Sequence, residues 1–316
     1  MPAYGILVTG LLSVVALAAP ETCEGAQHEQ NGLVPKGETV QPEQMAGIRE
    51  FSDRCLKNDR IANARVRGMG KIAEGMPHPL LETTVEDRFG AKIAYVDIDP
   101  CAGTVYMYIS ANRDEPAAKG HSIDDAITAD AAWQAAQPVL AYYGLSYARE
   151  EFRFQMGDSE PEGNDLYGAY WYIEYDYTYN GLPCRYNTFR VKLSAYSGTI
   201  LTVHNAPIIV PKEPQQKISK TKAIEQAKAW LEERLYLKGK QPTVDETAPD
   251  RIEEVIARPN RSYVVDGEAP EMKLTEEAFY CWEVPFEFIE DGNTFRRSVW
   301  VNIETGQVIG CWRYDK

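Results

Sequence analysis

The stretch Tyr170–Leu201 constrains the fold more than any other part of the chain, because it alternates apolar and polar residues on both sides of one turn. Apolar side chains occupy every second position of Trp171–Tyr179, as in a strand with one buried and one solvated face. Asn180-Gly181 follows, and this dipeptide is a strong hairpin signal. The stretch therefore predicts a β-hairpin, with a third strand that starts after Gly198.

The polar positions of this hairpin carry charges of opposite sign on its two strands. Glu174 and Asp176 lie on the first strand, and Arg190 and Lys192 lie on the second. Opposite charges that face each other across antiparallel strands contribute about 0.2–1 kcal/mol per pair. We therefore interpret the two carboxylates as structural partners of the basic residues and not as a catalytic pair.

The hairpin pattern returns at Phe279–Ile309, and its tail is found earlier, at Ala94–Val105. The chain therefore contains internal repeats of about 100 residues, each with a meander of antiparallel strands. A glycine turn ends each copy, at Gly103, Gly198 and Gly306. We predict a positive φ at Gly198 and Gly306, because a residue with a Cβ resists that conformation.

Amphipathic segments precede the later sheet copies and predict helices that open at Ser122 and at Ser219, where each hydroxyl can cap the first turn. Pro138 should kink or end the first of these helices. An earlier helix is expected over Pro42–Lys57. At a shift of 97 residues, the two later segments match at Ala126 and Ala223, and at Trp133 and Trp230.

A helix with one apolar stripe and a sheet with one apolar face can bury each other. We therefore expect an α+β fold of tandem units, each with one helix packed on an antiparallel three- to four-stranded meander sheet. An extra strand is expected near Ser262–Val265. The expected divisions are a signal peptide, a leader, a degenerate first unit, a second unit and a third unit, at residues 1–18, 19–41, 42–116, 117–211 and 212–316.

The N-terminus predicts export. Gly5–Ala19 is almost wholly apolar and ends in the small-x-small pattern Ala16-Leu17-Ala18, although no Lys or Arg precedes it. The run is too short for a membrane span and is typical of a secretory signal peptide. We expect a secreted, periplasmic or cell-envelope protein with no stable membrane span after cleavage.

The overall charge excludes some partners. The formal net charge is −14 and the pI is about 4.9, whereas nucleic acids and anionic membranes select Lys and Arg patches. We therefore expect neither as a partner.

Six cysteines, an even number, favour disulfides in an exported chain. We predict a bond between Cys281 and Cys311, because both fall on strands of the last sheet copy. The sequence leaves the pairing of the other four open, at Cys23, Cys55, Cys101 and Cys184.

Motifs for common chemistry are absent from the sequence. It contains no H-E-x-x-H, no G-x-S-x-G, no P-loop and no G-x-G-x-x-G after a predicted strand, and its four histidines are scattered. No cysteines have the C-x-x-C spacing of a zinc site. We expect no catalytic residues, no metal and no cofactor.

Exposed aromatic residues are the best candidates for a binding surface. Tyr170 and Tyr172 lie on the polar side of their predicted strand, and Trp300 is placed similarly in the last copy. Exposed rings on a sheet can bind a peptide or a sugar. The alternative is that these rings pack against a neighbouring unit.

This arrangement resembles the PepSY module, found in propeptides of thermolysin-like metalloproteases and in many exported bacterial proteins. The resemblance lies in the Ser-x-x-x-Ala helix starts, in Tyr179-Asn180-Gly181-Leu182-Pro183, and in the tails that contain Gly198 and Gly306. It implies a cystatin-like fold, export, and the inhibition or chaperoning of a peptidase. Since the sequence ends at Lys316, directly after the last strand, we expect that peptidase to be a separate protein.

The sequence thus predicts an exported, non-catalytic protein that binds another extracytoplasmic protein through a sheet face or an exposed edge strand. An alternative is a cell-envelope or carbohydrate-binding module that uses exposed sheet aromatics. A third hypothesis, an unrecognised hydrolase, requires a cleft with converging polar groups.

Overall fold

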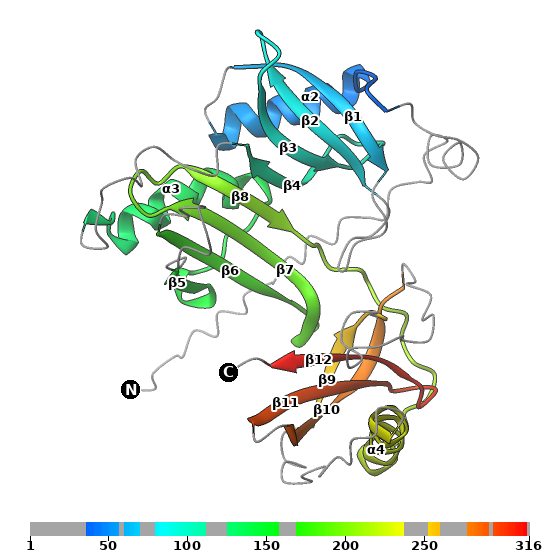
Figure 1. The fold of residues 1–316 in the computed structure, drawn as a ribbon. Helices are drawn as coiled ribbons and strands as arrows, with labels where there is room; N and C mark the ends of the chain where they lie inside the picture. Colours follow the sequence, from blue (N-terminus) through cyan, green and yellow to red (C-terminus); the bar gives the residue numbers. More distant parts are fainter. Residues whose placement is uncertain are drawn as a thin grey trace, which may run out of the picture.

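The computed structural model describes residues 36–56, 60–69, 80–111, 125–157, 169–236, 252–259, 277–290 and 293–314. The fold is α+β, with one large and mostly antiparallel sheet and few helices (Figure 1). Within these residues, no helix is long and apolar enough to cross a membrane. The predicted signal peptide and most of the predicted leader lie outside the described residues.

A helix followed by four strands occurs three times, and we call these groups the first, second and third units (Figure 1). The first unit contains α2 (Pro42–Phe51), a π-helical turn (Ser52–Leu56), β1 (Ile61–Met69), β2 (Leu81–Asp87), β3 (Lys92–Ile98) and β4 (Val105–Ser110). The second contains α3 (Ala129–Tyr142), a 3₁₀ turn (Arg149–Glu151), β5 (Arg153–Gly157), β6 (Tyr170–Tyr179), β7 (Leu182–Ser194) and β8 (Ile200–Asn205). The third contains α4 (Lys220–Tyr236), β9 (Glu253–Ala257), β10 (Phe279–Glu290), β11 (Asn293–Asn302) and β12 (Val308–Tyr314).

The units are joined through their sheets. Strands β4 and β8 pair in antiparallel fashion, so the sheets of the first and second units are continuous. The third unit joins through a parallel contact of β7 with β9, at Cys184 and Ile256. Strand β5 lies off the main path and pairs with β6. One core extends through the first and second units and also includes Ile256 and Tyr280 of the third, and a separate cluster lies under α4.

The central hairpin forms as predicted. Asn180 and Gly181 have φ values of 51° and 79°, the two positive values that a type I′ turn requires. Glu174 pairs with Arg190 across β6 and β7 and forms an ion pair with it, as expected. Asp176 forms an ion pair with Arg153 of β5 at 3.0 Å, a partner that the sequence did not predict.

The glycine turns also form as predicted, with φ of 71° at Gly198 and 76° at Gly306. A polar residue four positions before each glycine organises the turn. The Ser194 Oγ accepts backbone N–H bonds from the second and third residues after it, and the Asn302 Oδ1 accepts the same two bonds in its own turn. Asp99 does the same before Gly103, so the three turns are built alike.

The predicted helix start at Ser122 is wrong. Helix α3 begins at Ala129, because the Thr128 Oγ1 accepts the Ala131 N–H bond and caps the first turn, whereas α4 begins as predicted after Ser219. The helix also continues past Pro138 to its end at Tyr142. Thr128 caps α3 and Ser219 caps α4, so corresponding positions of the two helices are 91 residues apart in the sequence, and not 97. This shift superimposes fully buried residues: Ala132, Ala136 and Leu140 on Ala223, Ala227 and Leu231.

The first unit contains one α-helix and four strands, as the other two units do. Its helix α2 agrees with the helix predicted from Pro42, and the next turn buries Cys55. Strands β1 and β2 were not recognised in the sequence, and neither was β5. The extra strand of the third unit is Glu253–Ala257, while Ser262–Val265 lies outside the described residues.

The predicted bond between Cys281 and Cys311 is wrong, because both are buried thiols that form no disulfide. Strand β11 lies between their strands, which separates them by two strand spacings, about 10 Å, well beyond the reach of a disulfide. Their side chains also point to opposite faces. Cys281 pairs with Asn302 and Cys311 with Val299, and these two β11 positions are an odd number apart.

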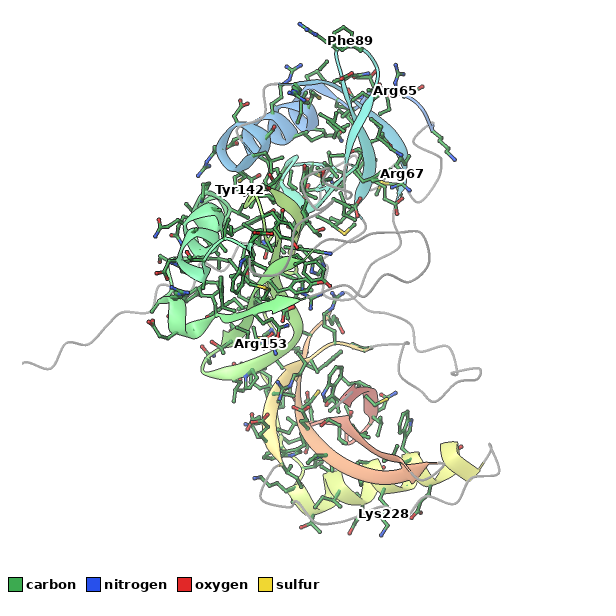
Figure 2. The ribbon with its side chains drawn as sticks, turned by 60° about the vertical axis from the view of Figure 1, so that its left-hand side comes forward. Arg65, Arg67, Phe89, Tyr142, Arg153 and Lys228 are labelled. Atoms are coloured by element: carbon green, nitrogen blue, oxygen red, sulfur yellow. The ribbon has the colours of Figure 1, made fainter. Side chains whose placement is uncertain are left out.

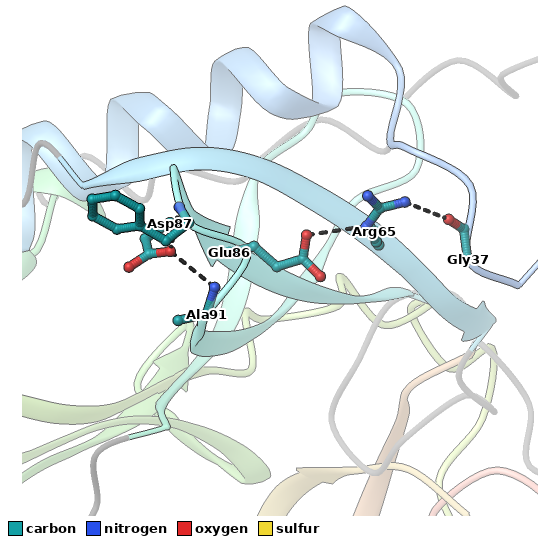
Figure 3. Close-up of polar contacts among 6 residues, drawn as sticks. Gly37, Arg65, Glu86, Asp87 and Ala91 are labelled. Carbon is teal, nitrogen blue, oxygen red and sulfur yellow. Dashed lines mark hydrogen bonds and ion pairs between the residues drawn. The ribbon is translucent and has the colours of Figure 1, made fainter.

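The outer edge of β1 is covered. Gly37 and Val40 donate backbone hydrogen bonds to the Val66 and Ala64 carbonyls of this strand. The Arg65 guanidinium reinforces the cover by donating to the Gly37 carbonyl at 3.2 Å and to the Glu86 carboxylate at 3.0 Å (Figure 3). The first unit therefore ends in a protected strand.

Candidate binding surface on the outer face of the sheet

The continuous sheet of the first and second units has one face packed on α2 and α3, and we call the opposite face the outer face. Residues paired across neighbouring strands share a face, so the strand registers define its rows. One row runs through seven strands and is almost entirely polar. It contains Glu82, Asp97, Met107, His204, Arg190, Glu174 and Arg153.

Exposed charged side chains lie on the part of the outer face formed by β5, β6 and β7. The side chain of Arg153 is 61% exposed and that of Arg190 is 47% exposed, whereas that of Glu174 between them is 12% exposed. Both arginines form ion pairs with Glu174, and Arg153 also contacts Asp176. The carboxylates therefore hold two guanidinium groups in fixed positions at the surface.

Tyr170 and Tyr172 lie beside these arginines, on the face that the sequence predicted. Their rings meet edge to face with centroids 4.6 Å apart. The Lys192 ammonium lies 3.7 Å from the Tyr170 ring centroid and 5.8 Å from that of Tyr172, so this one cation makes cation–π contacts with both rings. Partial burial, and then a hydrogen bond with Tyr170, raises the pKa of Tyr172 to about 12, so its hydroxyl stays protonated at neutral pH.

Trp300 does not belong to this surface. It is fully buried, on the face of the third unit's sheet that points away from α4. Its neighbours there include Val255, Cys281 and Ile309. The alternating pattern correctly placed Trp300 on the face of β11 opposite to Val299 and Val301, but that face is buried as well. Of the three predicted aromatics, the structure brings only Tyr170 and Tyr172 together.

The opposite end of the polar row is half-buried. Burial, and then the nearby Glu82 carboxylate, raises the pKa of Asp97 to about 6. Burial, and then the Arg190 cation, lowers the pKa of His204 to about 4. At neutral pH this end therefore carries an ionised aspartate and an uncharged histidine, with Met107 in register between them.

Possible metal ligands are not clustered in the described part of the chain. No group of three or more His, Cys, Asp or Glu side chains that could hold a metal ion occurs among them. Two members of the surface were not predicted from the sequence: Lys192, which was expected to pair with a carboxylate, and β5, which supplies Arg153. The alternation Arg-Phe-Gln-Met over residues 153–156 was the available signal for that strand.

No model of a known protein family matches the sequence, and no curated protein matches it. Among solved structures, the chain is similar to the C-terminal domain of Bacillus megaterium YpeB, with a TM-score of 0.38 and 15% sequence identity. The match covers 89% of this chain and 100% of that chain. We therefore infer function from the residues of the outer face.

Proposed function

We propose that the protein is an exported, non-catalytic binding protein whose partner is a separate extracytoplasmic protein. The outer face of β5, β6 and β7 is the contact surface. The observation that carries the proposal is the grouping of Tyr170, Tyr172, Arg190 and Arg153 on that open face. Tyrosine and arginine dominate binding energy at protein interfaces, because they combine a large contact area with directional hydrogen bonds.

The local charge supports a protein ligand. Three cations, Arg153, Arg190 and Lys192, share this region with two carboxylates, in a chain whose formal net charge is −14. The ion pairs restrict the side chains before a partner arrives, which lowers the entropy lost on binding.

We also propose that the three helix-plus-meander units are tandem PepSY-like units with cystatin-like folds, divided near residues 42–116, 117–211 and 212–316. The similar glycine turns and helix caps support this proposal. On this basis the partner is a peptidase that the protein inhibits or chaperones, in the periplasm, at the cell envelope or outside the cell.

The test compares capture by the full chain with capture by the variant Tyr170→Ala/Tyr172→Ala/Lys192→Glu, using extracytoplasmic proteins of the source organism. The control variant is Phe89→Ala, which removes a ring that is 78% exposed at the tip of the β2–β3 hairpin (Figure 2). We expect a peptidase that the wild type and the control retain and the triple variant loses. Equal retention by all three proteins would exclude the outer face as the contact surface.

Inhibition is then measured on the captured peptidase. Slower cleavage with the wild type, and normal cleavage with the triple variant, would support an inhibitor. Unchanged cleavage with a higher yield of refolded peptidase would support a chaperone.

A carbohydrate-binding module remains the second candidate, because the adjoining Tyr170 and Tyr172 rings could stack on a sugar. This hypothesis predicts glycan binding that Tyr172→Ala abolishes. Retention of glycan by Tyr172→Ala would count against it. Trp300 has no part in this version, since it is buried.

A further inference from the structure

Strand β5 is an exposed sheet edge. Within the described residues it pairs with β6 alone, and its Arg153, Gln155 and Met156 are exposed. The edge of β1, in contrast, is covered by residues 37–40, whose Gly37 and Val40 N–H groups bond to its carbonyls. An edge strand presents unpaired N–H and C=O groups that can pair with another strand.

The two faces of β5 differ in chemistry. Phe154 and Met156 lie opposite Ile173 and Trp171, on the face that packs on α3. Phe154 stacks on Trp171 with centroids 4.8 Å apart, while Met156 is 37% exposed at the rim. Arg153, Gln155 and Gly157 share the outer face, opposite Glu174, Tyr172 and Tyr170.

We propose that β5 pairs with β5 of a second copy of this chain, in an antiparallel two-fold dimer centred on Gln155. In this register Gln155 faces its own copy, Phe154 faces Met156, and Arg153 faces Gly157. All five residues of the strand are paired, and each face of one sheet continues into the same face of the other. Such self-complementarity is what a two-fold interface requires, since the same patch is used on both molecules.

The chemistry of β5 favours a second copy over an unrelated strand. Apolar side chains meet only apolar ones, and the Phe154–Met156 pairs gain sulfur–aromatic contacts. Arg153 faces a glycine, so no like charges oppose each other across the new pair. The second copy also contributes a residue to the outer face, because its Arg153 lies in the row of Gly157 and Tyr170.

The dimer is expected to be weak and to depend on salt. A single five-residue strand pair buries less surface than a standard stable interface. Each chain also carries a formal net charge of −14, which opposes association until salt screens it. Higher ionic strength should therefore strengthen the dimer.

The first test is sedimentation of the full chain from about 1 µM to about 500 µM, in low and in high salt. We expect a monomer–dimer equilibrium that salt shifts toward the dimer. The variant Met156→Lys places a charge against Phe154 of the second copy, and should weaken the dimer by about tenfold or more. The control Phe89→Lys adds the same charge at another exposed apolar position and should leave the equilibrium unchanged.

The second test is register-specific crosslinking under mild oxidation. Gln155→Cys should crosslink to itself, because directly opposed Cα atoms lie within disulfide range. Arg153→Cys alone should not crosslink, but it should crosslink to Gly157→Cys when the two variants are mixed. A protein that stays monomeric at every concentration, or one in which Arg153→Cys crosslinks to itself and Gln155→Cys does not, would overturn the proposal. Neither test needs an external partner, so their failure would leave the proposed function standing.

Discussion

The indole Nε1 of Trp171 donates a hydrogen bond to the Ile127 carbonyl at 3.2 Å, directly before the N-cap of α3. The third unit repeats the contact, with Trp282 donating to Ile218 at 3.0 Å before α4. The two isoleucines also donate their backbone N–H groups to the Ala195 and Ile303 carbonyls, at 2.7 and 2.8 Å. Each helix start is thereby fixed to its sheet on both sides.

The indole bond gives the first prediction. Trp171→Phe and Trp282→Phe should each lower the free energy of unfolding by about 1 kcal/mol for the lost hydrogen bond, in addition to the lost packing. Urea denaturation measures the change. Trp133→Phe is the matched control, because it removes the same indole atoms from α3 without touching either isoleucine carbonyl. Equal losses in all three variants would show that the bond contributes nothing beyond ring size.

The second prediction concerns a glycine inside α2. Alanine normally stabilises a helix interior by about 1 kcal/mol relative to glycine. At Gly47 the sign should reverse, because a Cβ there would lie 2.1 Å from the carbonyl oxygen of Gly103. We expect Gly47→Ala to destabilise the protein by about 2 kcal/mol or more, since the helix would have to move off the turn.

Gly68→Ala in β1 is the control for this variant, because a methyl group added at Gly68 would meet no heavy atom within 4 Å and the φ of this residue is not positive. The melting temperatures of the two variants measure the difference. A Gly47→Ala protein as stable as Gly68→Ala would refute the close packing of α2 on the Gly103 turn.

The turns and hairpins were predictable because their chemistry is local. Asn180-Gly181 needs two positive φ values, and Gly198 and Gly306 need one each, so a few adjacent residues determine them. The start of α3 was mispredicted because local chemistry alone does not decide which residue caps this helix. Ser122 and Thr128 are both competent caps, and only the packing of Ala132 and Ala136 against the sheet distinguishes them.

The candidate surface was only half predictable, because it depends on contacts between units and between strands. Alternation placed Tyr170 and Tyr172 on the outer face correctly. The same alternation placed Trp300 on the polar side of its strand, but it could not show that both faces of the third unit's sheet are covered. Similarly, the pairing of β5 with β6 brings Arg153 to Asp176, and this strand was not predicted from the sequence.

The third prediction concerns Arg185, which follows the parallel contact between the second and third units. Its guanidinium binds Glu283 at 2.7 Å and Glu253 at 2.5 Å, and these two carboxylates face each other across β9 and β10. Glu283 is 3% exposed, so the cation offsets like-charge repulsion in a buried setting. Arg185→Met should cost about 3–5 kcal/mol, because it removes this cation from a buried carboxylate.

A second substitution separates charge from packing at this junction. Glu283→Gln should recover part of the stability lost in Arg185→Met, since the amide needs no counter-ion. Arg54→Met is the control, because its ion pair with Glu50 at 2.8 Å is solvent-exposed and is worth under about 1 kcal/mol. A double variant no more stable than Arg185→Met would show that the guanidinium acts through packing alone.

The last prediction is a pair of opposed pH dependences on the outer face. The pKa of Asp97 rises to about 6 in the folded state, so between that pH and its ordinary pKa of 3.8 the native protein binds more protons than the unfolded chain. Its contribution to stability therefore increases as the pH falls through that range. The pKa of His204 falls to about 4 from 6.5, so the unfolded chain binds more protons there and stability decreases.

The two effects largely cancel in the wild type, and single variants should reveal them. With His204→Asn, only the Asp97 effect remains, and the free energy of unfolding should increase by about 2 kcal/mol relative to wild type as the pH falls from 6.5 to 4. With Asp97→Asn, it should decrease by a similar amount relative to wild type. Urea denaturation across this range measures both slopes, and profiles parallel to the wild type would show that neither group titrates differently on folding. Burial is the main cause of both shifts. Glu82 and Arg67 also act on Asp97, and Arg190 further lowers the pKa of His204, so removing Arg190 should raise the pKa of the histidine.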